Sequence, residues 1–144
     1  NDFMYNYILK SWVKEENIIL WWQSLWWALA INTAQNKNIY ALIVQSSFYS
    51  MVDMAKLKFP FLPIDYLIKY KFESYKKLKN IKVKTVFMHS KTDEVINYNE
   101  WEKLFNAMIW EKYFLELFWN HNYWYMNNYE QYINTLKDFL KIKS

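Results

Sequence analysis

Short apolar runs alternate with amphipathic stretches along most of the chain. The apolar runs are typical of strands covered on both faces, and they lie at 18–20, 39–44, 83–89 and 113–118. Helical spacing of apolar residues lies between them, at 2–10, 25–35, 99–109 and 129–142. Strands that alternate with helices predict an α/β fold, in which helices flank a parallel sheet of about four strands.

The stretch 46–80 breaks this alternation. Pro60 and Pro63 interrupt it, and the pattern predicts only one short helix, within 64–72, between turns. The whole chain of 144 residues is too short for two ordinary domains, so a single core is expected.

Polar residues follow each predicted strand, where a parallel sheet binds its ligands. Ser24 follows the first strand, Ser46 and Ser47 the second, Asp93 the third and His121 the fourth. A serine hydroxyl becomes a nucleophile when a histidine takes its proton, and a carboxylate orients that histidine and stabilises its charged form. Serine, aspartate and histidine in this chain order are the arrangement of an α/β-hydrolase triad.

Each of these residues also has a plain structural interpretation. Ser24 suits a helix N-cap, Asp93 a turn or cap, and His121 a loop. Glu94, next to Asp93, is an alternative acid. Ser46 and Ser47 are interpreted as loop polar groups because no helix follows them directly, and His89, at the end of the third strand, is assigned a structural role.

The sequence resembles small α/β-hydrolases of the serine-aminopeptidase-like or α/β-hydrolase domain-containing branch. The stretch "WQSLWWALA" reads as "GQSLGGALA" if each Trp replaces Gly, which is a G-x-S-x-G nucleophile elbow with its helix. The stretches "LIVQSSFYSMVDMAKLKFPFLP", "VKTVFMHSKTDEVINYNEWEKLF" and "YFLELFWNHNYWY" are similar to later segments of that branch, in order. The resemblance implies Ser24, Asp93 and His121 as the triad, and ester or amide hydrolysis through an acyl-enzyme without a metal or cofactor.

The resemblance begins only at the helix before the elbow. We therefore expect residues 1–144 to be the C-terminal part of one hydrolase domain, with a small cap-like insertion at about 48–79. One oxyanion donor would be the Leu25 N–H, while the loop that supplies the other belongs to the family's earlier half. Gln23 and Phe48 are the candidate substrate contacts. The apolar side chains of 48–72 suggest an apolar acyl group, or a cap packed on itself.

Tryptophan stands at several positions where glycine has a physical role. Average usage predicts roughly 10 glycines in this length, whereas the chain has no Gly and 9 Trp. Trp12 follows a helix, Trp22 and Trp26 flank the serine, Trp110 lies in a helix-to-strand turn, and Trp119 and Trp124 flank the histidine. Trp101, within a helix, is an exception without such an argument. We hypothesise that most or all of the nine replace Gly, as in a gene that encodes Gly by UGA. Genuine tryptophans would overpack the elbow and leave Ser24 inert.

Composition excludes several other functions. The chain has no Cys and no metal-ligand cluster in its sequence, which excludes a disulfide framework, a thiol nucleophile and a Cys-based zinc site, and is consistent with a cytoplasmic protein. Its net charge of +4 is spread along the chain, and the lysine-rich stretch 74–84 is interpreted as a solvated helix and turn rather than a nucleic-acid site. The apolar stretch 18–31 is too short for a transmembrane helix.

Two alternatives to a hydrolase remain at this point. A site of this kind can lose its activity, which would leave a binding module on the same fold. The 22% aromatic content and the positive charge also suit a peripheral membrane protein, an alternative that weakens if the tryptophans replace glycines. The sequence identifies neither the substrate, beyond a small-molecule or peptide ester or amide, nor the oligomeric state.

Overall fold

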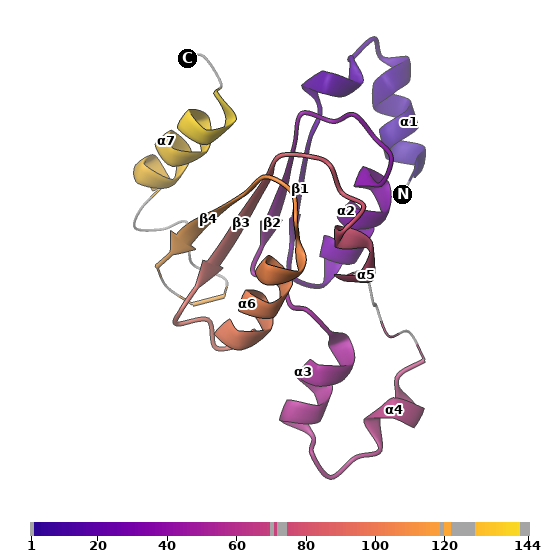
Figure 1. Cartoon of the computed structure of the whole chain (residues 1–144), viewed down its shortest axis with the longest axis vertical. Helices are drawn as coiled ribbons and strands as arrows, with labels where there is room; N and C mark the ends of the chain where they lie inside the picture. The colour runs from indigo at the N-terminus through magenta and orange to yellow at the C-terminus, as the bar shows by residue number, and fades with distance from the viewer. Residues whose placement is uncertain (1, 70, 72–74, 119, 122–128, 142–144) are drawn as a thin grey trace.

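The computed structural model describes residues 2–69, 71, 75–118, 120–121 and 129–141. Four strands form one sheet: β1 (Ile19–Gln23), β2 (Ala41–Gln45), β3 (Thr85–Ser90) and β4 (Lys112–Leu117). They are parallel and lie in sequence order, and helices cover both faces of the sheet (Figure 1). The predicted α/β class and the parallel sheet are confirmed.

The two faces of the sheet carry separate apolar cores. Along β2, Leu42 and Val44 point into the larger core, whereas Ala41 and Ile43 point into the smaller one, as the two-residue period of a strand requires. All five residues of β2 are buried, as expected of an inner strand covered on both faces.

The helices divide between these cores. The larger core contains buried residues of α2 (Trp27–Ala34), α5 (Tyr75–Leu78) and α6 (Tyr98–Ala107), with Tyr5 of α1 (Asp2–Lys10). The smaller core contains Tyr132, Leu136 and Leu140 of α7 (Tyr129–Leu140). These residues recur every fourth position and so form one stripe along α7, which is the one helix on its side of the sheet among the described residues (Figure 1).

The structure corrects several element boundaries. The first strand is β1, at Ile19–Gln23 rather than 18–20, because Trp21, Trp22 and Gln23 continue the ladder with β2. The helix expected from Leu25 begins at Trp27, after a 3-10 turn, η2 (Ser24–Trp26). The short helix expected within 64–72 is α4 (Ile64–Leu67).

The stretch expected to be irregular contains, besides α4 and α5, a further helix, α3 (Met51–Lys58). Ser50 is its N-cap, since its side chain accepts a hydrogen bond from the Asp53 N–H at 3.2 Å. The helix ends at Lys58, and its C-cap Phe59 lies directly before Pro60, which disfavours helical geometry in the residue that precedes it. Helices α3 and α4 extend away from the layered part, on the side where the strands end (Figure 1). Among the described residues, no helix has both the length and the apolarity needed to cross a bilayer.

Candidate active site

Ser24 lies directly after β1, at the first position of the 3-10 turn η2. Its φ angle of 55° falls in the left-handed region, which costs a residue with a Cβ on the order of 1–3 kcal/mol. Strain of this kind persists only where the surroundings impose it. Here β1 fixes the residue before Ser24 by pairing Gln23 with Gln45 of β2.

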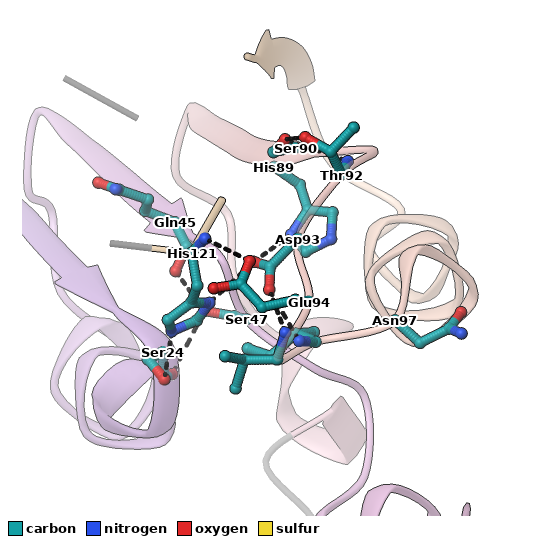
Figure 2. A network of polar contacts seen from close by, with 12 residues as sticks. Ser24, Gln45, Ser47, His89, Ser90, Thr92, Asp93, Glu94, Asn97 and His121 are labelled. Carbon is teal, nitrogen blue, oxygen red and sulfur yellow. Dashed lines mark hydrogen bonds and ion pairs between the residues drawn. The ribbon is translucent and has the colours of Figure 1, made fainter. Parts of the chain in front are cut away.

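Ser47 supports the same turn from the end of β2. Its buried hydroxyl donates to the Gln45 carbonyl at 2.9 Å and lies 3.4 Å from the Ser24 carbonyl. The sequence pattern suggested only a loop polar group here. The direct contact with the strained turn gives Ser47 a structural role beside Ser24 (Figure 2).

Asp93 lies in the loop between β3 and α6, with its side chain fully buried. One carboxylate oxygen accepts hydrogen bonds from the backbone N–H groups of Val95 at 2.9 Å and Ile96 at 2.8 Å. The other oxygen lies 2.8 Å from Nδ1 of His121. The turn geometry expected of Asp93 as a local cap and its contact with His121 are therefore both present, on different oxygens.

His121 follows β4 and joins the two other residues. Its Nε2 atom lies 3.3 Å from the Ser24 hydroxyl, and its Nδ1 atom faces Asp93 (Figure 2). The residue is 7% exposed. The structure thus brings Ser24, His121 and Asp93 together in a line of two hydrogen bonds, from the ends of three different strands.

The site's electrostatics suit proton transfer to His121. The hydrogen bond to Asp93 raises the pKa of His121 above its ordinary value, against the effect of burial, and the charges of Asp93 and Glu94 act in the same direction. Burial alone would raise the pKa of Asp93, but the bonds from His121, Ile96 and Val95 outweigh it and lower that pKa. Asp93 therefore stays ionised at neutral pH and can stabilise an imidazolium.

Two polar side chains hold the backbone of His121. The His121 N–H donates to Oε2 of Glu94 at 3.1 Å, and the His121 carbonyl accepts from Nε2 of Gln23 at 3.4 Å. The sequence suggested Glu94 only as an alternative acid and Gln23 only as a substrate contact. A carboxylate beside a candidate triad acid was the one signal available for the Glu94 contact.

Two further residues predicted for the site, Leu25 and Phe48, lie in different surroundings. Leu25, the expected oxyanion donor, lies in η2, where the backbone N–H groups of a first helical turn have no acceptor within the helix. The Phe48 side chain is 4% exposed and belongs to the larger core. Its predicted contact with substrate therefore stays a prediction, for a side chain that now also has a packing role.

His89 is the next-to-last residue of β3 and lies fully buried behind Asp93. Its Nδ1 atom is 3.9 Å from the Asp93 oxygen that faces His121. Burial lowers the pKa of His89 to about 4, which keeps the ring neutral at physiological pH. Among the described residues, no group of three or more His, Asp or Glu side chains could hold a metal ion.

The tryptophans near the site have contrasting environments. Trp22, before the serine, is partly buried against the larger core. Within the part of the chain that the structure describes, its buried indole N–H has no hydrogen-bond partner, and the same holds for the indole N–H of Trp101. Trp26, after the serine, is 59% exposed. Trp12 has a φ of 65°, the left-handed conformation expected after a helix. Trp119 and Trp124 lie outside the described residues.

A cavity opens beside the site, between α3 and the loop that carries Asp93. Its volume is about 360 Å³. Met54, Leu57 and Lys58 line one side, and Asp93, Glu94, Val95 and Asn97 line the other. The cavity therefore combines apolar walls with charged groups at the residues that contact His121.

Comparison with known proteins identifies the fold. No protein-family model matches the chain. An esterase of Pyrococcus furiosus is similar in structure with a TM-score of 0.66 and 14% identity, over 87% of this chain and 53% of the esterase. The acylaminoacyl peptidase of Pyrococcus horikoshii gives a TM-score of 0.71 at 14% identity, over 100% of this chain and 27% of the peptidase.

A monoacylglycerol lipase of Paleococcus ferrophilus extends the likeness, with a TM-score of 0.65 at 14% identity over 95% of this chain and 72% of the lipase. The chain thus spans about half the length of the esterase, at 53%, and less of the peptidase. Sequence identity this low carries information about the fold alone. Together with the parallel sheet and its helical layers, the likeness shows that the chain has the α/β-hydrolase fold.

Proposed function

We propose that the protein is a serine hydrolase that cleaves an ester or amide through an acyl-enzyme. The observation that carries this proposal is the line of contacts from Asp93 to His121 at 2.8 Å and from His121 to Ser24 at 3.3 Å. A second support is the left-handed φ of Ser24, since a nucleophile elbow holds its serine in a strained turn between strand and helix.

The mechanism follows from these positions. His121 Nε2 takes the hydroxyl proton of Ser24 as the oxygen attacks the substrate carbonyl, and Asp93 stabilises the resulting imidazolium. The Leu25 N–H would donate to the oxyanion. His121 then gives its proton to the leaving alcohol or amine. Water, deprotonated by the same nitrogen, attacks the acyl-enzyme and releases the acid.

The cavity beside α3 is the proposed substrate pocket. Met54 and Leu57 supply an apolar wall within reach of the loop that carries Asp93. The connection beyond α3 also exposes large apolar side chains, namely Phe59, Phe61, Leu62, Tyr66 and Leu67. We propose that 48–79 is a small cap and that the substrate carries an apolar acyl group, as in an ester or acyl-peptide.

The chain is also proposed to be the C-terminal part of a longer hydrolase domain, with Trp at glycine positions of the family. The shares of 53% and 27% of the esterase and peptidase support the first point. The positive φ of Trp12 supports the second, since the left-handed conformation is unfavourable for a residue with a Cβ and open to glycine.

A serine-directed fluorophosphonate tests the proposed function. We expect it to label the chain at Ser24, with loss of labelling in Ser24→Ala and retention in Ser90→Ala, a matched serine at the end of β3. Peptide mapping by mass spectrometry locates the adduct. Absence of label on a folded chain that carries the full N-terminal half of the domain would instead favour a binding module that has kept the fold and lost the chemistry.

A further inference from the structure

The backbone N–H and carbonyl of His121 form hydrogen bonds with side chains. In a strand residue, these groups would instead bond to the backbone of a neighbouring strand. The last paired residue of β4 is Leu117, opposite Ser90 of β3, so His121 lies beyond the ladder. Among the described residues, its N–H and carbonyl form no bond to another backbone group. They bond instead to the Glu94 carboxylate at 3.1 Å and the Gln23 amide at 3.4 Å.

These bonds answer a physical requirement. His121 is 7% exposed, and a buried N–H or carbonyl without a partner costs about as much as a lost hydrogen bond. The two partners come from different strand ends: Gln23 is the last residue of β1, and Glu94 lies in the loop after β3. Gln23 is the sequence neighbour of Ser24, and Glu94 is the sequence neighbour of Asp93. The two bonds therefore fix His121, which follows β4, relative to Ser24 and Asp93.

We propose that Glu94 and Gln23 are positioning residues for His121, and we call the pair the histidine clamp. This proposal rests on the proposed hydrolase function. The clamp sets the ring so that Nε2 faces the Ser24 hydroxyl while Nδ1 faces Asp93. Neither clamp residue touches the reacting atoms, and both act through the backbone of His121.

The charge of Glu94 acts on the pKa of His121, whereas the neutral amide of Gln23 does not. The groups that face His121 are Asp93 and Glu94 from the loop between β3 and α6, Ser24 from η2, and His89 behind Asp93. The Glu94 charge raises the pKa of His121 together with Asp93. An imidazolium formed on His121 during catalysis is therefore stabilised by a second carboxylate. The Glu94 carboxylate bonds to the backbone N–H of His121, whereas the Asp93 carboxylate bonds to its ring.

Glutamine at position 94 separates these two effects. Glu94→Gln keeps an oxygen that accepts the His121 N–H and removes the charge, whereas Glu94→Ala removes both. We expect Glu94→Gln to lower the pKa of His121 and keep the rate of ester hydrolysis at its alkaline plateau within about threefold. Glu94→Ala should lower the pKa as well and reduce the plateau rate about tenfold.

The Gln23 arm gives a different signature. Gln23→Ala removes a neutral donor, so we expect a plateau rate reduced severalfold with the pKa of His121 unchanged. Glu102→Gln, a charge removal at an exposed position of α6, serves as the matched control and should change neither quantity. A residue that only stabilised the fold would lower the melting temperature and leave both the plateau rate and the pKa of His121 unchanged.

Two independent measurements decide the proposal: the rate of nitrophenyl ester hydrolysis against pH, and the titration of the His121 ring nitrogens by NMR. The clamp is refuted if Glu94→Ala and Gln23→Ala hydrolyse the ester at the same plateau rate as Glu102→Gln. The electrostatic effect of Glu94 is refuted if both Glu94 variants titrate at His121 like Glu102→Gln. If the unsubstituted chain neither hydrolyses the ester nor reacts with the phosphonate, the proposed function fails, while the NMR titration still decides whether Glu94 controls His121.

Discussion

The ring of His89 lies parallel to the indole of Trp101, with 7° between the planes and 5.6 Å between the centroids. Both side chains are buried, at 0% and 2% exposure. Trp101 also lies against the rings of Tyr98, Phe105 and Phe114. Trp101 thus packs as an aromatic residue inside the larger core, directly behind the end of β3 that leads to Asp93.

Replacing Trp101 by Gly should destabilise the fold strongly. The cavity left by a buried tryptophan costs about 3–5 kcal/mol, and Gly inside a helix adds about 1 kcal/mol. The free energy of unfolding of Trp101→Gly, measured by urea denaturation, should be lower by this sum. The free energy of unfolding of Trp101→Phe should be lowered much less. Equal urea midpoints for Trp101→Gly and the unsubstituted chain would contradict the packing described here.

Trp12 should respond in the opposite direction. Its φ of 65° costs a residue with a Cβ about 1–2 kcal/mol, and its side chain is 95% exposed, so little packing is lost on its removal. Trp12→Gly is therefore expected to stabilise the fold by about 1 kcal/mol in the same urea assay. Trp12→Ala is the control: it removes the indole but keeps the Cβ, so it should give no such gain.

His89 should make the protein less stable in mild acid. Burial lowers its pKa to about 4 in the folded state, against about 6.5 when unfolded. The unfolded chain therefore binds more protons between these values, and stability falls as the pH drops from 6.5 towards 4, by up to about 1.4 kcal/mol per pH unit.

The raised pKa of His121 acts in another pH window. Protonation of His121 in the folded state adds stability as the pH falls from that pKa to about 6.5. Below pH 6.5 this contribution to the free energy of unfolding is constant. Urea denaturation at pH 6.5 and 5 should therefore show a loss of stability that is largely removed in His89→Leu. An equal loss in both proteins would mean that His89 is not the group responsible.

Asp93→Asn should remove most of the reactivity of Ser24. An amide at this position neither stabilises an imidazolium nor fixes the tautomer that places the proton on Nδ1, which costs about 10⁴ in the type case of the triad. We expect phosphonate labelling to slow by about that factor and the pKa of His121 to fall. Asp138→Asn, at an exposed position of α7, is the matched control.

The pH profile of the unsubstituted protein follows from the same contacts. His121 must be neutral to take the Ser24 proton, so activity is lost as the pH falls through its pKa. Because Asp93 and Glu94 raise that pKa, the acid limb should lie above the ordinary histidine value of about 6.5. A limb at or below this value would contradict the electrostatics of the site.

The sequence predicted the layers of the fold because each strand and helix has a clear apolar period. It missed α3, whose apolar residues bury little: Val52 is the one buried side chain of that helix. A helix held by its Ser50 cap and by neighbours distant in sequence leaves a weak periodic signal. The continuation of β1 through Trp21 and Trp22 depends equally on pairing with β2.

The order of polar residues at the strand ends predicted which side chains meet, since parallel strands end on one edge of a sheet. It did not predict the partners of the His121 backbone. Gln23, Ser47 and Glu94 are neighbours of Ser24 or Asp93 in space and act through hydrogen bonds to backbone groups. Such contacts depend on loop geometry rather than on a residue pattern.

The tryptophan hypothesis makes its sharpest prediction at the level of the gene. A φ of 65° at Trp12 is a feature of glycine positions, and Trp22 and Trp26 flank the strained turn at Ser24, whereas Trp101 packs among four aromatic rings. Codons that encode Gly by UGA should therefore occur at Trp12, Trp22 and Trp26, and UGG at Trp101. Nucleotide sequencing checks the codons, and the intact mass of the natively expressed protein checks the residues. UGG at every position would establish genuine tryptophans, and the bulk beside Ser24 would then be expected to suppress phosphonate labelling.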